Sequence, residues 1–176
     1  MCVRIFPLSF HDKELIAAVT EVIKSRLNIT VDIAESTFTL EGGRDPVRNQ
    51  INSNWILARL LEQSPDGNAR LLALTEQDLF SPVLTYVFGE AELGGRAAVV
   101  STHRFRNEFY GLAANPDLVR ERLVRETMHE LGHTYGLFHC AAYSCVMHPS
   151  SYAEEIDIKT SHFCNSCQQK LANSGK

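Results

Sequence analysis

Apolar residues recur near the start of the chain with the spacings of a strand, a helix and a second strand. Residues 3–6 form a short apolar run, and residues 12–27 carry apolar side chains three and four positions apart, the period of an amphipathic helix. Asn28 suits the end of that helix. Residues 29–33 then alternate between apolar and polar, which predicts a half-buried strand.

The middle of the chain is divided by turns that are rich in Gly and Pro. Gly42 and Gly43 precede Pro46, whose fixed φ suits the first turn of a helix. Residues 64–67 form a second strong turn signal. The elements expected up to Thr102 are a helix from Pro46 to about Gln63, strands at residues 69–75, 85–88 and 96–102, and a loop at residues 89–95.

A long helix is predicted from Asn115 to about Tyr135. Asn115, Pro116 and Asp117 supply an N-cap, a first-turn proline and a first-turn acid in sequence. The side expected to face the core carries Val119, Leu123, Val124, Met128, Leu131 and Tyr135.

The same helix carries two pairs of opposite charges, each four residues apart. They are Glu121 with Arg125 and Arg122 with Glu126, and we expect all four on a solvated face. Because strands alternate with helices, the pattern predicts an α/β fold (an α+β mixed sheet with helices on it). No repeat or composition break divides the chain, so a single domain over residues 1–176 is expected.

Composition narrows the classes of partner. The 176 residues are 44% hydrophobic and 22% charged, as in an ordinary globular domain, and the net charge of −4 offers no broad attraction for nucleic acid or an anionic membrane. No apolar run has the length of a membrane span. Residues 1–7 do not resemble a signal peptide, so a cytoplasmic protein is expected. The sequence does not settle the oligomeric state, and a monomer is favoured.

Candidate metal chemistry lies near the end of the long helix. His129 and His133 are four residues apart, so both imidazoles project from one side of the helix, where one Zn²⁺ can accept both. Glu130 is close enough to reach a metal-bound water without ligating the metal. Gly136 suits a left-handed helix end that returns His139 as a third ligand. Three histidines and one open position are typical of a catalytic zinc.

The cysteines indicate a second metal. Cys140, Cys145, Cys164 and Cys167 cluster in the last part of the chain, whereas Cys2 stands alone. In a reducing compartment, clustered thiols favour metal binding over disulfides. Two pairs of closely spaced cysteines predict a tetrahedral four-thiolate zinc site of structural type.

The histidine pattern followed by Met147 resembles the signature of metzincin metallopeptidases. The placement of the four cysteines around Met147 resembles one metzincin subgroup, the archaemetzincins, as do residues 74–80, 87–91 and 98–102. The resemblance implies a metzincin-like fold with a catalytic and a structural zinc, and Met147 as the Met-turn beneath the histidines. It also implies an N-terminal subdomain (residues 1–136), a C-terminal subdomain (residues 137–176), and residues 96–102 as the edge strand along the cleft.

The function expected from these features is zinc-dependent hydrolysis of a peptide or protein substrate, with Glu130 as the general base. One alternative is a catalytically weak or silent zinc protein that binds peptides or a protein partner through the same cleft. A second, a zinc ribbon for nucleic acid, is disfavoured by the negative net charge.

Overall fold

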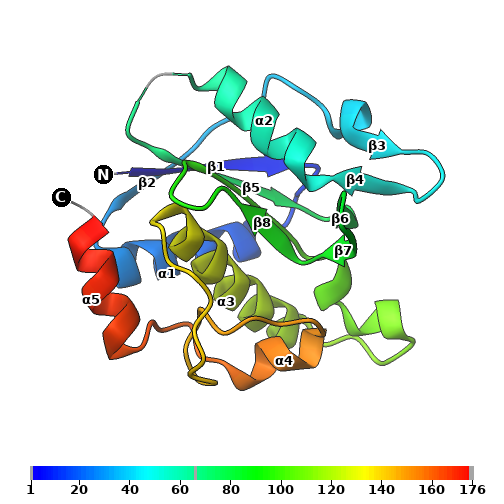
Figure 1. The fold of residues 1–176 in the computed structure, drawn as a ribbon. Helices are drawn as coiled ribbons and strands as arrows, with labels where there is room; N and C mark the ends of the chain where they lie inside the picture. The colour runs from blue at the N-terminus through cyan, green and yellow to red at the C-terminus, as the bar shows by residue number, and fades with distance from the viewer. Residues whose placement is uncertain (1, 66, 175–176) are drawn as a thin grey trace.

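The computed structural model describes residues 2–65 and 67–174, and a mixed five-stranded sheet lies at its centre (Figure 1). The strand order is β2-β1-β5-β9-β8, in which the first four strands are parallel and β8 runs antiparallel to β9. The predicted mixed sheet is therefore confirmed. The strands are β1 (Cys2–Leu8), β2 (Thr30–Ile33), β5 (Arg70–Thr75), β8 (Gly89–Ala91) and β9 (Ala97–Ser101).

Helices cover both faces of this sheet (Figure 1). Helix α2 (Ser53–Gln63) lies on one face, and α1 (Lys13–Leu27) and α3 (Pro116–Thr134) lie on the other. Side chains alternate across a strand, so Leu72 and Leu74 of β5 join the core beneath α1 and α3, while Leu71 joins the core beneath α2. Burial on both faces explains why the central strands are continuous apolar runs.

Local sequence signals fix the ends of α1 and α3. The Asp12 side chain accepts from the backbone N–H groups of Glu14 and Leu15, and Asn28 ends α1 in the left-handed conformation with φ of 53°. At α3, the Asn115 side chain accepts from the N–H of Leu118. The side chains of Asp12 and Asn115 satisfy N–H groups that have no partner within the helix, and the predicted ends at Asn28 and Asn115 are confirmed.

The prediction of a helix from Pro46 to about Gln63 is wrong for the residues before Ser53. The carboxylate of Asp45 accepts from two N–H groups of the following turn, and Asn49 is left-handed with φ of 53°, so the chain closes a turn instead of starting a helix. Ile51 then pairs with a strand, and the helix begins only at Ser53. The second sheet formed here has the order β3-β4-β6-β7, with β3 (Arg44–Asp45), β4 (Gln50–Asn52), β6 (Leu79–Ser81) and β7 (Leu84–Val87).

The edge strand also differs from the expectation. Strand β9, expected at the edge, lies between β5 and β8. The segment expected as a loop at residues 89–95 begins with β8, which forms the true edge. The rim of the sheet nearest α3 is therefore β8.

Two of the four charged residues expected on a solvated face are buried. Arg122 and Glu126 are 4% and 5% exposed. Arg122 pairs with Asp157, and Glu126 pairs with Lys159, so both reach a later segment and not each other. The Glu121–Arg125 pair within α3 is confirmed.

The remaining elements are short. The C-terminal part holds α4 (Ala153–Ile158), which lies below α3 in Figure 1, and α5 (Asn165–Ser174), which lies at the left of the view. Three 3₁₀ turns span Leu40–Gly43, His103–Phe105 and Asn107–Tyr110. Within the described residues, no helix has both the length and the apolar character to cross a membrane.

Candidate metal centres and active site

His129 and His133 of α3 are each held by a hydrogen bond from Nδ1 of the imidazole ring, which leaves the two Nε2 atoms facing each other. Nδ1 of His129 donates to the carbonyl of Val146 at 2.8 Å, and Nδ1 of His133 donates to the carbonyl of Leu137 at 2.7 Å. A carbonyl can only accept, so each Nδ1 carries the proton and each Nε2 keeps its lone pair. The two Nε2 atoms lie 3.1 Å apart.

His139 is brought to the same place by the turn after α3. Gly136 adopts φ of 83°, and the N–H of Leu137 donates back to the carbonyl of Gly132, so the helix ends in the left-handed turn that the sequence predicted. The His139 ring lies 5.3 Å from the His129 ring and 5.0 Å from the His133 ring, centroid to centroid. Ligand atoms of all three lie within 4.8 Å of one another.

This geometry fits a tetrahedral zinc ion. Zinc with Zn–N bonds of about 2.0–2.1 Å holds its nitrogens about 3.3 Å apart, close to the separation of the two Nε2 atoms. Burial lowers the pKa of His129 well below its usual range, and the nearby Lys159 adds to that effect. Burial also lowers the pKa of His133 and of His139. The imidazoles are therefore neutral at neutral pH, as metal ligands must be.

Glu130 is buried beside these histidines and beneath the edge strand. It is 4% exposed, and a Cβ added at Gly89 of β8 would lie 2.7 Å from its Cγ. Only a glycine lets β8 pass this close to the carboxylate. Burial, followed by repulsion from Glu126, raises the pKa of Glu130 well above its usual range. Glu130 thus has the environment that tunes a carboxylate for proton transfer.

Met147 packs directly under the active-site helix. It is fully buried, and a Cβ at Gly132 would lie 2.4 Å from its sulfur. The neighbouring residue, Val146, supplies the carbonyl that orients His129. Met147 therefore packs against α3 at Gly132, between His129 and His133 in the sequence, and its role as the Met-turn stays a prediction.

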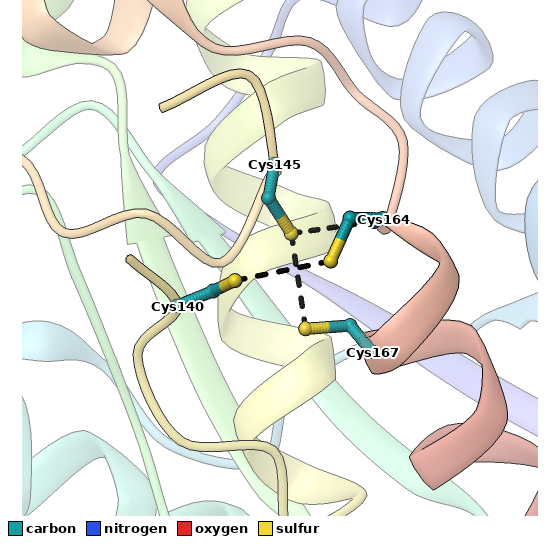
Figure 2. A group of neighbouring side chains, drawn as sticks. All are labelled: Cys140, Cys145, Cys164 and Cys167. Atoms are coloured by element: carbon teal, nitrogen blue, oxygen red, sulfur yellow. Dashed lines mark hydrogen bonds between the residues drawn. The ribbon is translucent and has the colours of Figure 1, made fainter. Parts of the chain in front are cut away.

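The four clustered cysteines converge from two segments (Figure 2). Cys140 and Cys145 come from the loop after α3, and Cys164 and Cys167 come from the start of α5. Sulfur–sulfur distances of 3.8 Å join Cys140 to Cys164 and Cys145 to Cys167. Zinc with Zn–S bonds of about 2.3 Å holds its sulfurs about 3.8 Å apart, whereas a disulfide would need about 2.05 Å. The cluster has the dimensions of a thiolate metal site.

The electrostatics of the cluster differ from one thiol to the next. A backbone N–H bond from Cys167 is the main cause that lowers the pKa of Cys164, to about 7. Burial raises the pKa of Cys145 and of Cys167. Cys2, far from the cluster, donates instead to the carboxylate of Asp32.

A cleft of about 720 Å³ opens above the three histidines and Glu130. Its walls come from residues 81–91 on one side and from residues 149–152, just after Met147, on the other. A groove of about 950 Å³ elsewhere runs along α1 and Ile33, beside the opposite edge of the sheet, and none of its lining residues is a histidine or cysteine. The three histidines and Glu130 therefore share one cleft, whereas the four cysteines are not among its lining residues.

Three residues near the site escaped sequence analysis. The sequence pattern places Glu126 on a solvated face and Gly89 in a loop, and it gives Lys159 no part in a site. Glu126 lines the cleft, and Lys159 lies behind it with its Nζ 3.5 Å from Nδ1 of His129. None of them carries a local pattern that reveals its place, because each acquires its partner only through the fold.

A buried HExxH helix, a third histidine after a glycine turn and an edge strand across a cleft define a zinc metallopeptidase of the metzincin type. The chain belongs to peptidase family M54, whose model matches residues 15–173. It is 38% identical over 175 residues to an archaemetzincin from Thermococcus kodakarensis, a match that covers 95% of this chain and 93% of that protein.

Solved structures agree with this assignment. A zinc-dependent peptidase from Methanocorpusculum labreanum superposes with a TM-score of 0.84 at 32% identity, covering 96% of this chain and 99% of that one. An archaemetzincin from Archaeoglobus fulgidus, solved with malonate, gives a TM-score of 0.81 at 32% identity, covering 97% and 99%. The expected family and enzyme class are therefore confirmed.

Proposed function

We propose that this zinc metallopeptidase binds its catalytic zinc through His129, His133 and His139 and uses Glu130 as the general base. The observation that carries this proposal is the pair of Nε2 atoms 3.1 Å apart, each oriented by an Nδ1–H bond to a carbonyl, in the cleft that Glu130 also lines. A zinc ion held by these three histidines would polarise a scissile carbonyl and would lower the pKa of a bound water molecule to about 7.

Glu130 moves the proton in this proposal. Its carboxylate accepts a proton as water attacks the peptide carbonyl, and it then delivers that proton to the leaving amine. Its raised pKa supports the second step, because burial disfavours the ionised carboxylate and so stabilises the protonated form from which the proton is delivered.

The peptide is proposed to bind along β8 in an extended conformation. The N–H of Ser101 donates to Phe88, and the N–H of Glu92 donates to Ala97, so alternate residues of this rim face β9. By that register, the backbone groups of Gly89 and Ala91 face away from the sheet and are available to a substrate strand.

A second, structural zinc is proposed at Cys140, Cys145, Cys164 and Cys167. It would join the loop before Met147 to α5, a segment that has little core of its own. Because a thiolate site needs reduced cysteines, we also propose that the protein works in the cytoplasm.

Cleavage of a mixed peptide library tests the proposal, with zinc-loaded wild type and Glu130→Gln compared by mass spectrometry. We expect new peptide termini with wild type only, and the same zinc content in both proteins. Turnover by Glu130→Gln would exclude Glu130 as the base. If neither protein cleaves any peptide although zinc is bound to both, the peptide-binding alternative would be favoured.

A further inference from the structure

Lys159 is the C-cap of α4, and its side chain is fully enclosed, with 0% exposure. Removing an ammonium group from water costs free energy unless other groups replace its hydration. The groups that contact Nζ of Lys159 therefore indicate what this residue does. They come from three separate parts of the site described above.

Two of these partners accept hydrogen bonds. Nζ of Lys159 donates to the carbonyl of His148 at 3.0 Å and to the carboxylate of Glu126 at 3.3 Å. His148 follows Met147 and precedes residues 149–152, which form one wall of the cleft. Glu126 lies one turn before Glu130 on α3 and lines the same cleft.

The third partner is a histidine of the catalytic centre. Nζ of Lys159 lies 3.5 Å from Nδ1 of His129. That nitrogen already donates its proton to Val146, so it cannot also accept from the ammonium group. Lys159 therefore lies behind the ring as a cation in contact with it, and it limits how the ring can turn.

We infer that Lys159 is a positioning residue of the catalytic centre: through Glu126, the His148 carbonyl and the ring of His129 it holds α3, the cleft wall and one histidine in register. The inference rests on the proposed role of His129 as a zinc ligand. It assigns to Lys159 no contact with substrate. Groups that support a metal ligand from behind are worth roughly 10–100-fold in metal affinity or activity.

A second buried ion pair serves as a control that distinguishes a positioning role of Lys159 from a general contribution to stability. Arg122 and Asp157 join the same two elements, α3 and α4, one helical turn earlier, with a distance of 2.6 Å. Arg122 is 4% exposed, comparable to Glu126. This pair touches none of the three histidines, so breaking it perturbs the α3–α4 contact without reaching the site.

The test compares Lys159→Met/Glu126→Gln with wild type and with the control Asp157→Asn. The double variant removes both charges of the pair, so it leaves no buried unpaired charge, and its net effect on the charge around the site is zero. Each zinc-loaded protein is titrated with a chelator while the reactivity of the cysteine thiols is followed. Zinc that leaves while the thiols stay protected comes from the three-histidine site.

We expect the double variant to hold that zinc about 10-fold or more weakly than wild type and to lose kcat by a similar factor. Asp157→Asn should lose thermal stability but keep wild-type zinc affinity. A double variant with zinc affinity within about threefold of wild type would overturn the inference and leave Lys159 as a charge balance for Glu126.

A second variant covers the case in which the double variant does not fold. Lys159→Gln is uncharged and one bond shorter than lysine, so it cannot keep all three contacts of Nζ. It is measured in the same way, and wild-type zinc affinity in it would also overturn the inference. Zinc affinity is read without substrate. If wild type cleaves no peptide, the proposed function fails while the role of Lys159 is still decided.

Discussion

Gly89 offers the sharpest test of how the edge strand and the general base share space. In a Gly89→Ala variant, the new methyl group would lie 2.7 Å from Cγ of Glu130 and 2.8 Å from the carbonyl oxygen of Val99. Carbon atoms normally approach to about 3.5–4.0 Å, so about 1 Å of extra room is needed. Val99 lies in β9 within the sheet and cannot retreat. Glu130 or β8 must therefore move.

The magnitude follows from that displacement. Forcing a methyl group into a packed site costs about 1–3 kcal/mol, which for a chain of this size lowers Tm by about 2–12 °C. Moving a catalytic group by about 1 Å costs roughly 100-fold in rate. We therefore expect kcat/KM to fall about 100-fold while the zinc content stays at the wild-type value.

The assay is peptide hydrolysis beside thermal unfolding, with Gly111→Ala as the control. Gly111 has φ of 75° and nothing within 4 Å of an added Cβ, so alanine there strains the backbone by about 1–2 kcal/mol without touching the site. The control should lose stability and keep its turnover. Wild-type turnover in Gly89→Ala would refute the reasoning that β8 constrains Glu130.

Two further predictions concern charge and the second metal site. Burial raises the pKa of Glu90, so its stabilising contribution is full below the ordinary pKa of about 4.5 and is lost as pH rises through the folded pKa. Glu90→Gln should therefore have a higher Tm than wild type at pH 7.5 and the same Tm as wild type near pH 4. An equal difference in Tm at the two pH values would contradict the argument from burial. Cys164→Ser should lower bound zinc from two to one per chain by elemental analysis. It should also weaken the remaining zinc roughly 10-fold, because the N–H of Cys140 donates to the carbonyl of Met147; unchanged affinity would show that the two sites are independent.

The parts of the site that sequence could predict are those set by local rules. The cap at Asn115 and the left-handed turn at Gly136 each depend on a few neighbouring residues, and they fix where α3 begins and where His139 returns. The spacing of His129 and His133 follows from helix geometry alone. The cysteine cluster was predictable because few other arrangements satisfy four reduced thiols.

The parts that sequence could not predict depend on pairing across the fold. Strand β8 is three residues long and begins with a glycine, and only its pairing with β9 makes it a strand. Pro46 was compatible with a helix start, but the Asp45 carboxylate satisfied the next two usable N–H groups in a turn. In both places the local preference was weak, so a distant or competing partner decided the outcome.

The charges on α3 show most clearly why the amphipathic pattern failed. Residues 126–132 are buried without interruption, because β8, the segment around Met147 and the segment after α4 enclose this part of the helix. A helix buried on all sides has no solvated face, so a charged residue or a histidine on it needs a partner or a task. Glu126 accepts a hydrogen bond from Lys159, and His129 donates one to the carbonyl of Val146. Among the described residues, the carboxylate of Glu130 has no hydrogen bond to a cation or a backbone group. The carboxylate left without a compensating partner is thus the one that we propose exchanges a proton.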